Sequence, residues 1–218
     1  MKVFVRKAPL KLILKWTQRV LFSGAILLLS YCVFVLGDTW LFQHRQQQTL
    51  DRLLREAQSS VTRAAVSPSA AGALPVRVAS FPPPAVGPDG LIGRMEIPRL
   101  SMSVVLVEGT SGAMLRRAAG HIAGTGLPGQ PGNIGIAAHR DTFFRPLRNI
   151  AHGDIITITT LGGGYSYRVV STIVVDPYDV AVLNPNDGSE ILTLVTCYPF
   201  YFVGAAPRRF IVRAERIL

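Results

Sequence analysis

Residues 193–199 read Thr-Leu-Val-Thr-Cys-Tyr-Pro, a short apolar run with one cysteine near its end. β-Branched and aliphatic residues followed by a proline are typical of a strand that ends at that point. Cys197 is the only cysteine outside an apolar N-terminal segment. A lone thiol at the end of a strand is a candidate nucleophile, although most free cysteines are small buried hydrophobes.

Strands are predicted throughout the chain from residue 91 to residue 218. Short runs rich in β-branched residues alternate there with Gly, Pro, Asn and Asp. A short helix is also expected at 112–119, capped by Thr110 or Ser111. Many short strands and few helices favour an all-β fold that closes, or nearly closes, into a barrel. The predicted strands are 91–97, 104–107, 134–139, 154–160, 165–175, 191–197 and 209–217.

Strand alternation relates three polar residues to one another. Side chains two residues apart share one face of a strand. His139, Cys197 and Arg209 each fall opposite the bulkier apolar residues of their strand. This parity favours a shared groove over three separate positions in the core.

The N-terminal part of the chain has the pattern of a membrane anchor. Residues 20–37 are 18 uncharged, mostly apolar residues, which as a helix would span about 27 Å. Six basic residues and no acid precede them in 1–19. The positive-inside rule then predicts a cytoplasmic N-terminus with the rest of the chain outside. The basic excess therefore argues for membrane orientation, since residues 91–218 hold 12 arginines against 9 acids.

Composition changes twice more before the strands begin. Leucine and alanine at helical spacing predict a stalk, and six prolines then predict a partly stiff linker that gives the barrel reach. The expected order is a basic cytoplasmic segment (1–19), a transmembrane helix (20–37), a helical stalk (38–66), a linker (67–90) and a β-barrel (91–218).

Three segments together resemble the signatures of sortases, the membrane-anchored cysteine transpeptidases of bacterial surfaces. They are His-Arg-Asp at 139–141, Thr-Leu-Val-Thr-Cys at 193–197 and Arg-Phe-Ile-Val at 209–212. The stretch that follows Cys197 is most similar to the class D branch, and the resemblance covers residues 91–218. It implies a closed β-barrel of about eight strands with one or two short helices, after a transmembrane helix and a stalk.

The resemblance also implies roles for the matched residues. Cys197 would attack the carbonyl after the threonine of a sorting signal similar to Leu-Pro-x-Thr-Gly and form a thioester. His139 would protonate the leaving amine and deprotonate the incoming one. Arg209 would donate hydrogen bonds to the oxyanion or to the substrate backbone. The implied partners are a surface protein with such a signal and an amine acceptor, either a cell-wall precursor or a protein lysine.

The same resemblance implies no cofactor, metal ion or nucleic acid, and a catalytic domain on the outer side of a bacterial cytoplasmic membrane. Arg209 is preferred to Arg208 because it begins the Phe-Ile-Val run. His121 either shapes the site or is a structural histidine held by hydrogen bonds. Asp141 either orients the catalytic imidazole or caps a turn, and Thr196 is a further candidate for shaping the site.

Two other functions stay open at this point. The chain could be a tethered cysteine peptidase that only hydrolyses, or a non-catalytic β-barrel for adhesion or scaffolding with an inert thiol. A kinase is excluded despite His-Arg-Asp at 139–141, because residues 91–218 contain no lysine. One cysteine with scattered histidines does not make a zinc site.

Overall fold

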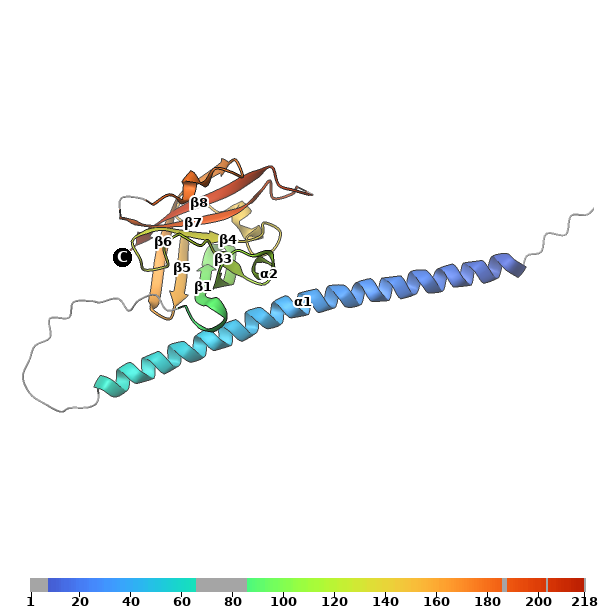
Figure 1. The fold of residues 1–218 in the computed structure, drawn as a ribbon, viewed down its shortest axis with the longest axis horizontal. Helices are drawn as coiled ribbons and strands as arrows, with labels where there is room; N and C mark the ends of the chain where they lie inside the picture. Colours follow the sequence, from blue (N-terminus) through green and yellow to red (C-terminus); the bar gives the residue numbers. More distant parts are fainter. Residues whose placement is uncertain (1–7, 66–85, 186–187, 203, 218) are drawn as a thin grey trace, which may run out of the picture. The chain divides into compact units, whose positions relative to one another are not determined.

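The structure is a computed structural model that describes residues 8–65, 86–185, 188–202 and 204–217. The chain divides into two compact units, Met1–Leu41 and Phe42–Leu218. One helix, α1 (Ala8–Ala65), belongs to both, and eight strands follow it (Figure 1). Part of the predicted basic segment and most of the predicted linker lie outside the described residues.

The first unit contains the apolar part of α1. Its large apolar side chains from Leu12 to Leu36 are exposed. By length and composition α1 could cross a membrane, as predicted for residues 20–37.

The second unit is an eight-stranded closed barrel, which confirms the predicted fold class. The order around the barrel is β1-β2-β3-β4-β7-β8-β6-β5. β2 pairs with β3 and β4 pairs with β7 in parallel, and the other neighbours are antiparallel. The strands are β1 (Leu91–Ile97), β2 (Met102–Glu108), β3 (Ala119–His121), β4 (Gly132–Ala137), β5 (Ile155–Thr160), β6 (Gly163–Val175), β7 (Glu190–Tyr198) and β8 (Arg208–Ile217).

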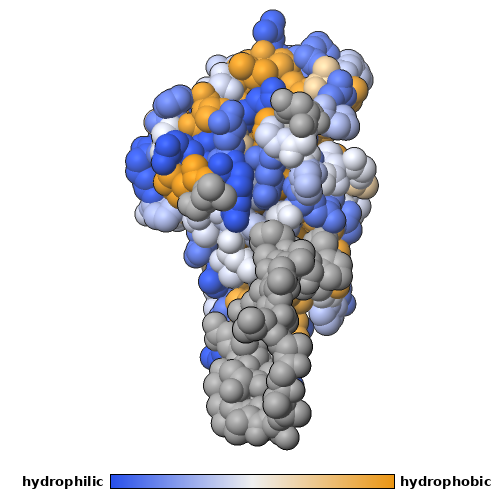
Figure 2. Space-filling view, turned by 90° about the vertical axis from the view of Figure 1, so that its left-hand side faces the viewer, coloured by the Kyte–Doolittle hydropathy of each residue, from blue (hydrophilic) through white to orange (hydrophobic). Residues whose placement is uncertain are grey.

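Short helical turns connect the strands. They are α2 (Gly112–Leu115) and the 3-10 turns η1 (Pro88–Gly90), η2 (Pro98–Leu100), η3 (Arg145–Asn149) and η4 (Val180–Leu183). Inside the barrel, alternate apolar residues of every strand except β3 pack with Ala119 of β3 into one core. On the face shown in Figure 2, hydrophobic side chains lie in several small patches between hydrophilic ones.

Two local elements differ from the prediction. α2 is shorter than the predicted 112–119, and Ser111 caps it by accepting a hydrogen bond from the Met114 N–H at 3.3 Å. β3 was not predicted, because three residues without a β-branched side chain carry little strand signal. A Cβ atom on Gly120 would lie 2.2 Å from the Gly109 carbonyl oxygen, so glycine permits the close backbone approach that forms this strand.

Part of the predicted stalk is packed against the barrel. Leu50 of α1 is fully buried among apolar residues of β1 and β2. The side-chain amide of Gln43 bridges two backbone groups, accepting from the Val105 N–H at 3.1 Å and donating to the Arg117 carbonyl. The helix from Phe42 onward is therefore part of the folded unit that contains the barrel.

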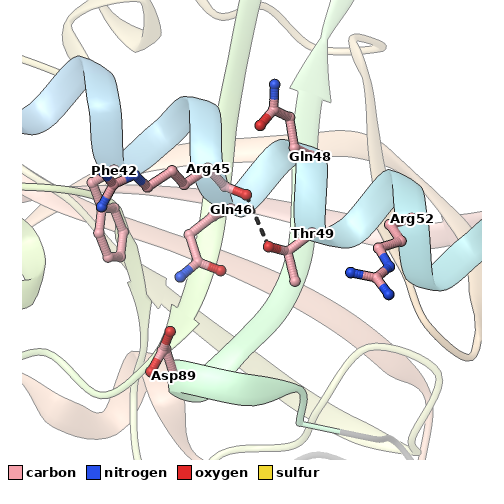
Figure 3. A pocket seen from close by; sticks show the side chains of 7 residues that line it. All are labelled: Phe42, Arg45, Gln46, Gln48, Thr49, Arg52 and Asp89. Atoms are coloured by element: carbon pink, nitrogen blue, oxygen red, sulfur yellow. Dashed lines mark hydrogen bonds between the residues drawn. The ribbon is translucent and has the colours of Figure 1, made fainter.

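A cavity of about 520 Å³ lies between this part of α1 and η1 (Figure 3). Both polar and apolar side chains line it, and none of the predicted site residues is among them. The lining residues are Phe42, Arg45, Gln46, Gln48, Thr49, Arg52 and Asp89.

Candidate active site

Two predicted site residues pair on adjacent strands, and the third, His139, lies two residues beyond the end of the strand on their other side. β7 is bonded to β4 on one side and to β8 on the other. Cys197 pairs directly with Arg209 in the β7–β8 ladder. Ala137, the last residue of β4, pairs with Val195 in the parallel β4–β7 ladder, and the Ala138 N–H also donates to the Val195 carbonyl at 3.3 Å. The same register continued by two residues brings the backbone of His139 level with Cys197. Neighbouring strands are about 4.8 Å apart, so by this register Arg209, Cys197 and His139 follow one another in a short row, with His139 just past the end of β4.

The row faces away from the barrel core, in agreement with the predicted parity. At the alternate positions, Leu194 and Val212 are fully buried in the core. Next to the row on its own face lie Ala137, Val195 and Ile211, which are apolar and pair across the same strands. Apolar residues therefore border the polar row on the same face.

The nucleophile and base candidates are both accessible in part. Cys197 is a half-buried free thiol. His139 is also half-buried, and its ring nitrogens have no hydrogen-bond partner among the described residues. Both side chains can therefore be reached in part from outside the barrel.

Asp141 makes no hydrogen bond or ion pair with His139. It is exposed in the turn that the Phe144 N–H closes by donating to the His139 carbonyl at 3.0 Å. Within the described residues Asp141 makes no hydrogen bond or ion pair. The described structure therefore gives the imidazole no acidic orienter.

Thr196 ties the two strands together next to the row. Its hydroxyl is buried and donates to the Ala138 carbonyl at 2.8 Å. Ala138 directly precedes His139, so this bond holds the backbone that presents the imidazole.

His121 is held inside the fold by hydrogen bonds. It is 3% exposed, and its Nδ1 lies 2.9 Å from a carboxylate oxygen of Glu108. Its Nε2 lies 2.9 Å from the Gly126 carbonyl oxygen and 3.0 Å from the Thr125 hydroxyl. These contacts fit the structural alternative for His121, since both ring nitrogens are occupied.

Arg209 is partly engaged by its own loop. Its Nη1 donates to the Arg208 carbonyl at 3.1 Å and to the Ala206 carbonyl at 3.4 Å. Nε and Nη2 make no bond among the described residues, so donors remain for a ligand. Arg208 is exposed and lies opposite Tyr198.

Sequence reasoning did not identify Arg140 as part of the site. Its Nη2 donates to the Phe202 carbonyl at 2.6 Å and to the Gly204 carbonyl at 3.1 Å. Both acceptors belong to the loop that joins β7 to β8. An arginine next to the candidate base, with no acid assigned to it, was the signal available in the sequence.

Asn133 and Thr193 were also not identified. Asn133 Nδ2 donates to the carbonyls of Val182 at 2.9 Å and Asn184 at 3.2 Å, and its Oδ1 accepts from the Thr193 hydroxyl at 2.6 Å. Asn133 shares the face of His139, so this buried network anchors η4 on the face that carries the row. A polar residue on that face of the predicted strand was its only signal.

The clearest pKa shifts arise away from the row. The hydrogen bonds from the Arg99 guanidinium hold the pKa of the Asp154 carboxyl below its ordinary value. Burial raises the pKa of Tyr167, and its hydrogen bond to Glu190 raises it further. The bonds of Asp154 and Tyr167 therefore connect parts of the fold that lie outside the row.

No group of three or more His, Cys, Asp or Glu side chains that could hold a metal ion occurs within the described ranges. A thiol, an imidazole and a guanidinium in one row can instead perform acyl transfer, in which a nucleophile, a proton carrier and a charged donor act on one carbonyl.

Known proteins are similar to this chain in sequence and in fold. A family model described as a sortase domain matches residues 95–217. Sortase D of Bacillus subtilis is 34% identical over 139 residues, which are 64% of this chain and 69% of that protein.

Two solved structures are similar as well. One is a Clostridium perfringens sortase D5 transpeptidase, with a TM-score of 0.61 and 24% identity, covering 81% of this chain and 98% of that one; at this identity it supports the fold. The other is sortase C2 of Group B Streptococcus pilus island 1, with a TM-score of 0.57 and 31% identity, covering 61% of this chain and 77% of that one.

Proposed function

Because this chain belongs to the sortase family, we propose that it is a membrane-anchored transpeptidase that acts through a thioester at Cys197. Its substrate would be a surface protein with a sorting signal similar to Leu-Pro-x-Thr-Gly, and its acceptor an amine. Support comes mainly from one observation, the pairing of Cys197 with Arg209 on strands whose other neighbour, β4, leads directly into His139.

In the first half of the reaction, the Cys197 thiolate attacks the carbonyl carbon after the signal's threonine. The carbonyl oxygen becomes an oxyanion in a tetrahedral intermediate. His139, in its protonated form, gives its proton to the departing amide nitrogen, because an amide nitrogen leaves only as an amine. The C–N bond breaks, the C-terminal fragment leaves, and a thioester remains on Cys197.

In the second half, a neutral acceptor amine attacks the thioester carbon. His139, now neutral, removes a proton from the attacking nitrogen, since a protonated amine has no free electron pair. The thiolate leaves and the new amide bond is complete. The enzyme returns to its starting protonation state, because one proton was given and one was taken up.

Arg209 suits the developing negative charge in both halves. A guanidinium stays charged throughout and does not compete for the transferred proton. Arg209 lies opposite Cys197 on the neighbouring strand. Its Nε and Nη2 make no bond among the described residues, so both would be available to a substrate. Such donors contribute most when they are held in place before the reaction.

The same proposal includes a location. The apolar helix would cross a bacterial cytoplasmic membrane once, with the basic N-terminus inside. The barrel would then meet surface proteins and the acceptor, a cell-wall precursor or a protein lysine, on the outer side.

Acyl-enzyme trapping tests the proposed chemistry. The detergent-solubilised full chain is incubated with Leu-Pro-x-Thr-Gly peptides, and intact-mass and peptide-mapping spectrometry then locate any acyl adduct. We expect an adduct on the peptide containing Cys197, none on Cys32, and none in Cys197→Ala. Adding an amine should convert the adduct to a ligated product. Identical behaviour of wild type and Cys197→Ala contradicts the proposal, and hydrolysis that is unaffected by the amine identifies a peptidase.

A further inference from the structure

The loop between β7 and β8 joins two members of the row. Cys197 lies one residue before the end of β7 and Arg209 one residue after the start of β8. The described connecting residues, 199–202 and 204–207, therefore lie between two members of the row. The backbone of Arg209 is paired with β7 and β6, so the loop can act on Arg209 mainly through its side chain.

Side chains from the chain following His139 hold this loop. Arg140 bonds the carbonyls of Phe202 and Gly204, and its guanidinium lies 5.8 Å from the centre of the Phe202 ring. Arg148 Nη1 donates to the Tyr201 hydroxyl at 2.9 Å, with its guanidinium 5.6 Å from that ring. Hydrogen bonds from a charged group are stronger than those between neutral groups, and Arg140 makes two of them to the loop backbone.

The loop in turn orients Arg209. The Ala206 carbonyl, two residues beyond Gly204, accepts from Arg209 Nη1. A continuous chain of contacts thus runs from His139 through Arg140 and the loop to Arg209, which pairs with Cys197. His139 and Arg209 are therefore linked through Arg140 and the loop, independently of Cys197.

We propose that Arg140 is a positioning residue that fixes the β7–β8 loop and, through it, the place of Arg209 relative to Cys197 and His139. This rests on the proposed function, since positioning matters only if the row performs acyl transfer. Arg140 itself touches loop carbonyls, so its loss should slow the chemical step and leave substrate binding largely intact. A displacement of about 1 Å in a reacting group costs on the order of a hundredfold in rate.

Single-turnover acylation of Cys197 in the full chain tests this role. Arg140→Met keeps the apolar stem and removes the donors. Arg140→Lys keeps the charge but lacks the planar guanidinium, whose Nη2 donates to both carbonyls and which lies over the Phe202 ring. Arg168→Met is the matched control, because Arg168 is exposed on β6 and its side chain makes no hydrogen bond or ion pair with the described residues.

We expect Arg140→Met to lower the maximal acylation rate about tenfold to a hundredfold with little change in the half-saturating peptide concentration. Arg140→Lys should be intermediate and the control unchanged. Brief chymotrypsin treatment should cleave after Tyr201 or Phe202 faster in Arg140→Met, because the loop is released, while the melting temperatures stay close.

Equal acylation rates in Arg140→Met and the control overturn the proposal, as does loop cleavage at the wild-type rate. If Arg140→Met loses its cooperative melting transition, Arg140→Lys decides, and a wild-type rate in that variant overturns the proposal. A wild-type protein that forms no acyl-enzyme refutes the proposed function instead, so the two failures are distinguishable.

Discussion

Changing Asn133 to aspartate should remove the anchor of η4 while keeping the shape of the side chain. Asn133 is 3% exposed, and its amide nitrogen donates to two backbone carbonyls, those of Val182 and Asn184. An ionised carboxylate has no N–H to donate. The variant would therefore lose two hydrogen bonds and direct a buried negative charge at two carbonyl oxygens.

The magnitude follows from these contacts. Each lost bond costs about 1 kcal/mol, and the buried charge with its unpaired carbonyls adds roughly 1–3 kcal/mol. The sum is about 3–5 kcal/mol in the free energy of unfolding at neutral pH. For a domain of this size, about 2–4 °C of melting temperature corresponds to each kcal/mol, so the expected decrease is roughly 6–20 °C.

The loss should depend on pH. The protonated acid can donate to one carbonyl while the ionised form is repelled, so folding should raise the pKa of the introduced carboxyl. A group whose folded pKa is raised favours folding below its unfolded pKa and loses that contribution as the pH rises through the folded pKa. The difference from wild type should therefore shrink as the pH is lowered from 7 toward 4.

Thermal melting of the full chain, followed by circular dichroism at several pH values, measures this effect. Asn184→Asp makes the same chemical change at an exposed side chain and should melt like wild type. If Asn133→Asp melts within about 1 °C of this control at pH 7, where the calculation gives roughly 6–20 °C, the buried network does not anchor η4.

Two further predictions concern stability. Leu50→Ala should lower the free energy of unfolding by about 2–5 kcal/mol, because Leu50 is fully buried against the barrel; denaturant melts beside the exposed control Arg55→Ala would show this, and equal midpoints would mean that α1 does not pack there. The stabilising effect of the Arg99–Asp154 pair should be fully present at neutral pH, begin to decrease near pH 4, and be lost as the pH falls further through the folded pKa, because the folded pKa of Asp154 is lowered. Melting of wild type and Asp154→Asn from pH 7 to pH 3 should therefore converge at the acid end, and a constant gap would contradict the assignment.

The parts of the fold that local pattern specifies were predictable. β-Branched runs marked every strand except β3, and alternation correctly put Leu194 and Val212 in the core and Cys197 and Arg209 on the other face. These features depend on the period of two in a strand, which is visible within a few residues.

The remaining features depend on contacts between distant residues. Arg140 meets a loop more than 60 positions away, and Gln43 of α1 reaches β2 across a similar separation. No local period records such contacts. Asp141 shows the opposite limit, because its closeness to His139 in sequence left two roles open, orienting the imidazole or capping a turn, and among the described residues its exposed side chain makes no hydrogen bond or ion pair for either role.

The two kinds of strand pairing in the row differ in what they hold constant. Cys197 and Arg209 belong to one antiparallel hairpin, so a slide of that hairpin carries both together and preserves their separation. His139 instead follows β4, which pairs with β7 in parallel and lies far from it in sequence. A shift of β4 along β7 would change the distance between His139 and Cys197 without changing the pairing of Cys197 with Arg209. The buried bond from Thr196 to Ala138 adds to the backbone ladder between β4 and β7 in resisting that shift, at the residue directly before His139.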